Sequence, residues 1–122
     1  MNKIRSSSFE ELSSDALKVR LKILELAHSS GGGQHLGGGL SMVEIMCYLY
    51  SKVIDIESVK SKSKKRNRFI LSKGHGVLGF YPVLHHYGLI STENLSTYKS
   101  ELSELISHPI RNLDNGIESS NG

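Results

Sequence analysis

Apolar residues at helical spacing open the chain. They recur at intervals of four, three, four and three residues, at Leu12, Ala16, Val19, Ile23 and Leu26. Residues with this spacing share one face of a helix. Ser8, with Glu11 three residues later, is the pattern of a capping box at a helix start. The pattern therefore predicts a helix from about Phe9 to His28, with one face buried.

Glycine then interrupts the pattern, because six of the nine residues from 31 to 39 are glycine. Backbone this free is costly to hold in a helix, so the run predicts a loop, which contains His35. Ser41 and Glu44 form a second capping-box pattern. The residues that follow, Met42 to Ser51, are apolar almost all round, which predicts a buried helix.

Polar and cationic residues dominate from 55 to 67, which predicts an exposed basic loop. A short apolar run, Phe69-Ile70-Leu71, follows and is rich in aromatic and β-branched residues. These residue types favour a strand, at about 69–72. Ser72-Lys73-Gly74-His75-Gly76 comes directly after the run and predicts a loop.

Two further helices are expected before the pattern fades. The first is predicted by an apolar stripe at Val77, Phe80, Tyr81, Leu84 and Tyr87. Gly88 is well placed to cap its C-terminus. The second, shorter helix is expected over Ser91 to Leu95. Beyond Leu105 the chain becomes polar, with His108-Pro109 near the start of this tail.

One strand cannot stand alone, since a strand must hydrogen-bond to another. Two interpretations remain open from the residues. In one, the chain is an essentially helical domain with a single extended segment. In the other, it is the opening piece of a larger α/β unit whose remaining strands lie elsewhere.

Composition narrows the class of protein. The chain has 122 residues, of which 38% are hydrophobic and 22% charged, and this is typical of one globular domain. Its single cysteine, Cys47, lies in an apolar run and is expected to be buried and reduced. No run approaches the roughly 18 to 20 apolar residues of a membrane-spanning helix, so we expect no membrane association and a cytoplasmic protein.

The net charge of +3 comes from one short segment. Six of the fifteen cations lie between residues 60 and 68, and without them the remaining nine cations and twelve acids give −3. This run has no interleaved aromatic side chains to stack on bases, so a nucleic-acid partner is not expected. A solvated basic loop is the simpler interpretation.

Histidines beside glycines are the candidate chemistry. His35 and His75 each lie between glycines just before a predicted helix. Glycine admits a bulky anion to the backbone, a helix N-terminus offers free N–H donors, and histidine adds a donor or a proton shuttle. The combination suits phosphate. No histidine pair has the spacing of a ligand set, so no metal site is expected within this chain.

The order of these motifs resembles the N-terminal part of the transketolases, which are thiamine-diphosphate enzymes. The matching features are His35 in a glycine-rich loop, Ser72-Lys73-Gly74-His75, His108-Pro109 and Gly116-Ile117-Glu118, over about residues 12 to 122. The variety most resembled carries this region on a separate N-terminal subunit. The implied fold is α/β: the mainly helical opening portion of a three-layer thiamine-diphosphate-binding domain, with one clear strand at about 69–72. Residues 1–122 would then be an incomplete N-terminal domain, in which 55–67 is an exposed basic loop.

The resemblance also implies residue roles. His35 matches a histidine near the substrate that assists proton transfer, and His108 one that meets the hydroxyl groups of the ketose. His75 matches the histidine that contacts the cofactor diphosphate. Gly122 matches the first residue of a loop that packs against the cofactor.

Some family features differ or are missing. Gln34 stands where the family usually has glycine, and Asn121 replaces a more usual threonine. The Gly-Asp-Gly segment that holds Mg²⁺ and the glutamate that activates the cofactor do not occur in the chain. The expected function is transfer of a two-carbon ketol unit between sugar phosphates, within a dimer, once a missing C-terminal portion or subunit completes the site. The chain alone is expected to be inactive. The alternative is a non-catalytic remnant that keeps its helices for association.

Overall fold

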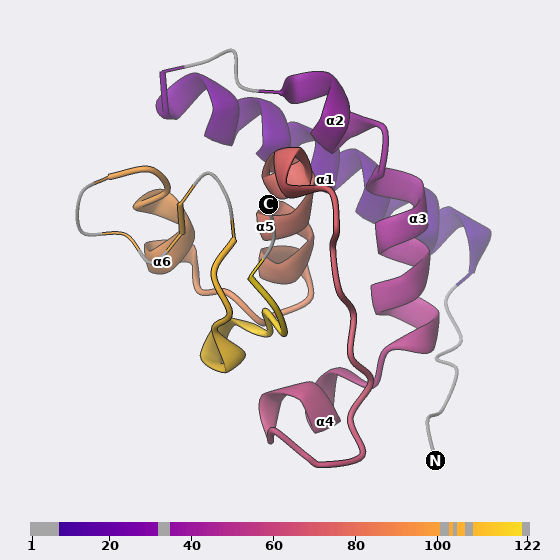
Figure 1. The fold of residues 1–122 in the computed structure, drawn as a ribbon. Coiled ribbons are helices and arrows are strands. Elements are labelled where there is room, and N and C mark those ends of the chain that lie inside the picture. Colours follow the sequence, from indigo (N-terminus) through magenta and orange to yellow (C-terminus); the bar gives the residue numbers. More distant parts are fainter. Residues whose placement is uncertain (1–7, 32–34, 101–102, 104, 107–108, 121–122) are drawn as a thin grey trace.

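The fold is a cluster of short helices around two longer ones (Figure 1). The computed structural model describes residues 8–31, 35–100, 103, 105–106 and 109–120. The helices in these ranges are α1 (Phe9–Ser29), α2 (Leu36–Leu40), α3 (Val43–Tyr48), α4 (Ile56–Lys60), α5 (Val77–His86) and α6 (Thr92–Ser96). The described ranges also contain one π-helical turn, at Leu49–Val53, and two 3-10 turns, at Gly74–Gly76 and Leu113–Asn115.

Helix α5 is the centre of the core. It contacts α1, α2, α3 and α6, and every residue from Val77 to Leu84 is buried. A helix that is apolar all round is stable only when other elements surround it. The predicted stripe from Val77 to Tyr87 is thus confirmed as a helix, and the backbone at Gly88 has φ 85°, the left-handed conformation that ends it.

Helix α1 is apolar on two faces. Its predicted stripe is confirmed as the buried face, with Val19 at 1% exposure and Ile23 at 0%. Leu17, Leu21 and Leu24 lie on another face and remain 58%, 57% and 47% exposed. The amphipathic pattern therefore identifies the core face, while these three leucines remain about half exposed.

Helix α3 is less buried than its composition predicts. Ile45 and Tyr48 are 64% and 51% exposed, although Met46 and Cys47 between them are buried. The expected burial of Cys47 is confirmed. A groove of about 560 Å³ runs between α1 and α3, with its lining formed by Phe9, Leu12, Ser13, Ala16, Arg20, Glu44, Cys47 and Tyr48.

Serine side chains cap the starts of two helices, and the cap at Ser8 is the one that the sequence predicts. The Ser8 hydroxyl accepts a hydrogen bond from the Glu11 backbone N–H at 3.1 Å. The Ser91 hydroxyl accepts one from the Asn94 backbone N–H at 3.0 Å, at the start of α6. In each case the side chain satisfies a donor that the helix itself leaves unpaired.

The glycine run is not entirely a loop, and this prediction is wrong for residues 36–40. These residues form α2, which lies beside the beginning of α5 (Figure 1). Helix propensity disfavours such a helix, but its tertiary contacts with α5 compensate. The helix also displaces the expected cap, because Ser41 ends α2 and its hydroxyl donates to the Gly38 carbonyl. Helix α3 begins at Val43, and its N-cap residue, Met42, makes no side-chain cap.

The strand predicted at 69–72 is also not found. The chain runs extended there (Figure 1), with Ile70 61% exposed between half-buried Phe69 and buried Leu71, but no β-ladder is assigned in the described ranges. The alternation of exposed and buried residues is typical of a strand, but no segment among the described residues pairs with it. The family's three-layer α/β architecture thus stays a prediction.

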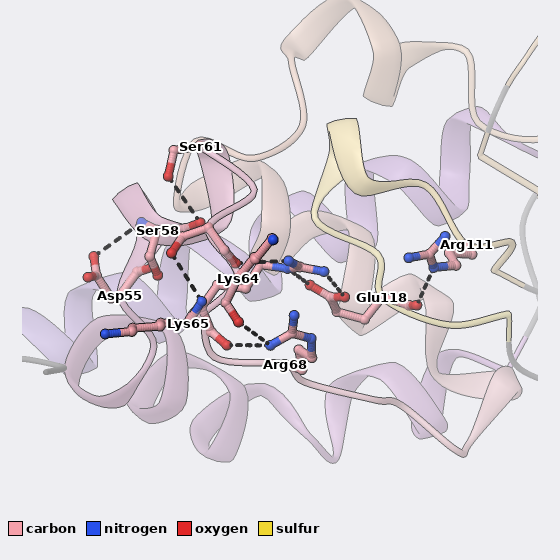
Figure 2. Close-up of polar contacts among 10 residues, drawn as sticks. Asp55, Ser58, Ser61, Lys64, Lys65, Arg68, Arg111 and Glu118 are labelled. Carbon is pink, nitrogen blue, oxygen red and sulfur yellow. Dashed lines mark hydrogen bonds and ion pairs between the residues drawn. The ribbon is translucent and has the colours of Figure 1, made fainter.

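The basic segment, residues 60–68, is tied to the C-terminal segment, residues 111–120. The predicted loop at 55–67 in fact begins with α4, whose Ile56 and Val59 are buried. Beyond it, the Arg66 guanidinium and the Glu118 carboxylate form a bidentate ion pair, at 2.6 Å and 3.0 Å, with both side chains less than a tenth exposed. Within the C-terminal segment itself, Arg111 Nε donates to the Glu118 backbone carbonyl (Figure 2), and a second, exposed ion pair between the two segments joins Lys62 to Asp114.

No helix among the described residues has the length and apolarity needed to cross a membrane.

Candidate functional site

The fold brings His35 and His75 together from loops 40 residues apart in sequence. Their ring centroids are 4.3 Å apart and the ring planes meet edge to face at 66°. Both residues are largely exposed, so a ligand from solvent can reach them. Two of the predicted site residues thus form one patch.

The backbone at His35 is strained. It has φ 51° and ψ 38°, the left-handed conformation, and the residue lies directly before α2. This conformation costs a residue with a side chain roughly 1–2 kcal/mol, although histidine tolerates it better than most. Strain of this kind is often found where a side chain is held for function.

The turn that carries His75 is built from glycine on both sides. Gly74 and Gly76 are buried, and His75 lies between them in the 3-10 turn that leads into α5. A Cβ on Gly76 would lie 2.8 Å from the Met42 sulfur, so the Met42 side chain would have to move to admit one. The turn therefore brings bare backbone and one imidazole to the N-terminal end of a ten-residue helix.

A cation lies beside the histidine pair. The Lys73 ammonium donates to the Ser41 hydroxyl at 3.4 Å, and its Cε lies 3.4 Å from the position a Gly76 Cβ would take. The Lys73 side chain thus crosses the 3-10 turn. Two imidazoles, one ammonium and a helix N-terminus give this patch the donors and positive potential that an anion requires.

His108 and Gly122, the two other predicted site residues, lie outside the described residues. Among the residues that the structure does describe, no group of three or more His, Cys, Asp and Glu side chains is arranged to hold a metal ion. The histidine patch is accordingly suited to an anion and has no carboxylate cage of its own.

Two polar clusters were not anticipated from the sequence. In one, Asp15 on α1 accepts from the Tyr87 hydroxyl at 3.1 Å and contacts the His86 ring at 3.0 Å, which ties α1 to the end of α5. In the other, the hydrogen bond from Arg66 holds the pKa of Glu118 below its usual value. Partners 71 and 52 residues apart leave no periodic signal in a single sequence.

Comparison with known proteins agrees with the motif order. The family model described as "Transketolase, thiamine diphosphate binding domain" matches residues 14–122. The chain therefore belongs to the transketolase family.

The similar curated proteins indicate the variety, since three of them are named as subunits of a transketolase. The chain is 36% identical over 115 residues to an apulose-4-phosphate transketolase subunit of Actinobacillus succinogenes, covering 94% of this chain and 42% of that protein. It is 34% identical over 113 residues to the protein of the same name in Phocaeicola vulgatus, covering 93% and 40%. It is 32% identical over 112 residues to "6-deoxy-6-sulfo-D-fructose transketolase subunit SqwG" of a Clostridium species, covering 92% and 40%. The chain spans about two fifths of the length of these relatives.

Proposed function

We propose that this chain forms the diphosphate-binding side of a transketolase-type active site. The observation that carries the proposal is the His35–His75 pair, because the two family-matched histidines meet at 4.3 Å across different loops. Isolated loop histidines have no reason to converge in this way. Family membership and the anion-binding character of the patch support the same function.

Each residue has a specific task in this proposal. His75, in the turn at the start of α5, donates to the cofactor diphosphate, and Lys73 adds positive charge beside it. His35 faces the substrate side and moves a proton to or from a sugar hydroxyl. His108 is expected to contact the ketose hydroxyls, and Gly122 to begin the loop that packs on the cofactor.

The bound cofactor would supply the nucleophilic carbon that accepts the two-carbon unit, so the protein's work is binding, orientation and proton transfer. We expect Mg²⁺ to accompany the diphosphate, with ligands outside the described residues. We further expect sugar phosphates as substrates, a cytoplasmic location, and a complete dimeric enzyme in which another polypeptide segment or subunit supplies the remaining groups. By itself the chain should bind the cofactor weakly and turn over little or no substrate.

Calorimetry with thiamine diphosphate and Mg²⁺ tests this function. The wild-type chain should bind, and His75→Gln should bind more weakly by about tenfold, the loss of roughly one charge-assisted hydrogen bond. His28→Gln is the matched control, since His28 lies exposed at the end of α1. No binding by wild type, or equal binding by both variants, would contradict the assignment.

A chimera extends the test to turnover. This chain would replace the aligned 115 residues of the Actinobacillus succinogenes protein, which are 36% identical. Ketol transfer by the chimera with the partners that the natural protein uses, and its loss in His75→Gln, supports the proposal. Activity that survives His75→Gln unchanged would sink the role of that residue.

An association module without cofactor is the second candidate function. It is favoured by the exposed leucines of α1, Leu17, Leu21 and Leu24. In that case the chain would bind neither thiamine diphosphate nor diphosphate at any concentration tested, and the chimera would assemble without turning over substrate.

A further inference from the structure

Helices α2 and α5 touch through backbone at a pair of buried glycines, Gly39 and Gly79. A Cβ on Gly39 would lie 2.8 Å from the Gly79 nitrogen, and a Cβ on Gly79 would lie 2.6 Å from the Gly39 carbonyl oxygen. The clashing atoms on both sides are backbone. Neither helix can therefore accept a side chain here without moving away from the other.

The same contact lies close to the two histidines. His35 directly precedes α2, four residues before Gly39, and His75 lies four residues before Gly79. Between these points, a Cβ on Gly38 would lie 3.3 Å from the His75 carbonyl oxygen. Helix α2 thus rests on the backbone of His75 itself, so any separation of α2 from α5 also separates the two imidazoles.

We infer that Gly39 and Gly79 are positioning residues for the histidine pair: their backbone contact sets how closely His35 approaches His75. Neither glycine touches a ligand. Because glycine has no side chain, α2 can pack against α5 closely enough to bring the His35 and His75 ring centroids to 4.3 Å. The inference rests on the proposed function only for its consequence in binding, because the geometry stands without a ligand.

This arrangement matters for a diphosphate because both rings must reach one ligand at the same time. A displacement of about 1 Å in a positioned group can lower turnover by roughly 10²-fold. A Cβ in the α2–α5 contact requires a shift approaching that size, since ordinary carbon contacts are about 3.5 to 4.0 Å. Small residues at these two positions are then a requirement of the site and not of the helices.

A graded alanine series along α2 tests the inference. At Gly37 an added Cβ meets nothing within 4 Å, at Gly38 it meets the His75 carbonyl at 3.3 Å, and at Gly39 it meets backbone at 2.8 Å. Alanine improves helix propensity at all three positions. Helix propensity therefore cannot explain a loss of the His35–His75 contact along the series, so such a loss must come from the clash of α2 with α5.

The readout is the nuclear Overhauser cross-peak between the ring protons of His35 and His75 in the full chain, assigned with His35→Gln and His75→Gln. We expect Gly37→Ala to keep the wild-type intensity, Gly38→Ala to weaken it, and Gly39→Ala and Gly79→Ala to lose it. Far-UV circular dichroism shows which variants remain folded. A general loss of stability in a folded variant would not remove this one cross-peak.

Each outcome decides the question. Wild-type cross-peak intensity in folded Gly39→Ala and Gly79→Ala would overturn the inference. If those two variants fail to fold, Gly38→Ala decides, because a weakened cross-peak supports the inference and an unchanged one overturns it. The cross-peak is recorded without cofactor, so a failure of thiamine diphosphate to bind would count against the proposed function alone.

Discussion

Helices α2 and α5 meet through bare backbone, whereas the C-terminal segment meets the basic segment through charges. At the first contact two glycines leave no room for even a methyl group. At the second, the Glu118 carboxylate lies between cationic residues of both segments (Figure 2), with Arg66 as its ion-pair partner. Both contacts are long-range, but they respond to different changes.

The difference shows which interactions hold the histidine patch in place. Close packing does not depend on pH or salt, and it fails only when volume is added or removed. A buried ion pair depends on the protonation of its carboxylate, and its removal exposes one unpaired charge. The histidine pair should accordingly keep its geometry under conditions that loosen residues 111–120.

The largest effect is expected from a cavity in the packed region. Ile23 on α1 is 0% exposed, so Ile23→Ala should lower the free energy of unfolding by about 2–5 kcal/mol. Leu21→Ala, on the exposed face of the same helix, should change it by about 0.5 kcal/mol or less. Urea denaturation followed by circular dichroism measures both. Equal losses would mean that the exposed face of α1 is covered in solution.

A smaller, local loss of stability is expected when acid breaks the Arg66–Glu118 ion pair. The Arg66 hydrogen bond lowers the pKa of Glu118 from its ordinary value of 4.5. The unfolded chain then binds more protons than the folded chain between the two pKa values, so the stabilisation is present above about pH 4.5 and is lost as the pH falls through the folded pKa. Glu118→Gln should remove this dependence.

Amide hydrogen exchange of residues 111–120, measured at pH values from 6 down to 3, follows that loss. In wild type, the protection of these amides should fall as the pH falls. In Glu118→Gln, their protection should already be low at pH 6 and should not change with pH. Lys62→Ala is the matched control, because it breaks the exposed Lys62–Asp114 ion pair between the same segments. Exposed pairs contribute about 0–1 kcal/mol, so the control should retain the wild-type profile. Protection that does not change with pH in wild type would contradict the assignment of the pH-dependent stabilisation to Glu118.

The smallest expected effect is a gain in stability. His35→Gly should raise the free energy of unfolding by about 0.5–1 kcal/mol, since relief of the left-handed strain exceeds the entropy that glycine adds to the unfolded chain. His28→Gly, in ordinary helix, should lower it by about 1 kcal/mol. Thermal denaturation compares the two. A loss of stability in His35→Gly would show that the His35 side chain stabilises the fold, and the strain argument would fall.

Local patterns predicted most of the helices. The stripe of α1, the Ser8 cap, the short helix after Ser91 and the Gly88 terminus all depend on residues a few positions apart, and all are confirmed. Helix α2 was missed because glycine propensity describes an isolated chain, while the stability of α2 comes from its contact with α5. The strand at 69–72 has the right residues but lacks a pairing neighbour among those described.

The kind of ligand that we propose for the candidate site could be predicted from the sequence, but the contacts that position its residues could not. Glycines around His35 and His75 indicate an anion site, and motif order indicates the family. No single-sequence pattern specifies that α2 rests on the His75 carbonyl or that Arg66 pairs with Glu118. Such contacts depend on packing between elements far apart in the chain.

Titration of the chain with inorganic diphosphate tests the central claim most directly. The six histidines include internal controls, among them His28 on α1 and His85 and His86 at the end of α5. Heteronuclear NMR of the imidazole signals should show His35 and His75 shifting together, along one saturation curve, while these three controls remain unchanged. If His35 and His75 do not move, or if all histidines move alike, the histidine pair is not a diphosphate site.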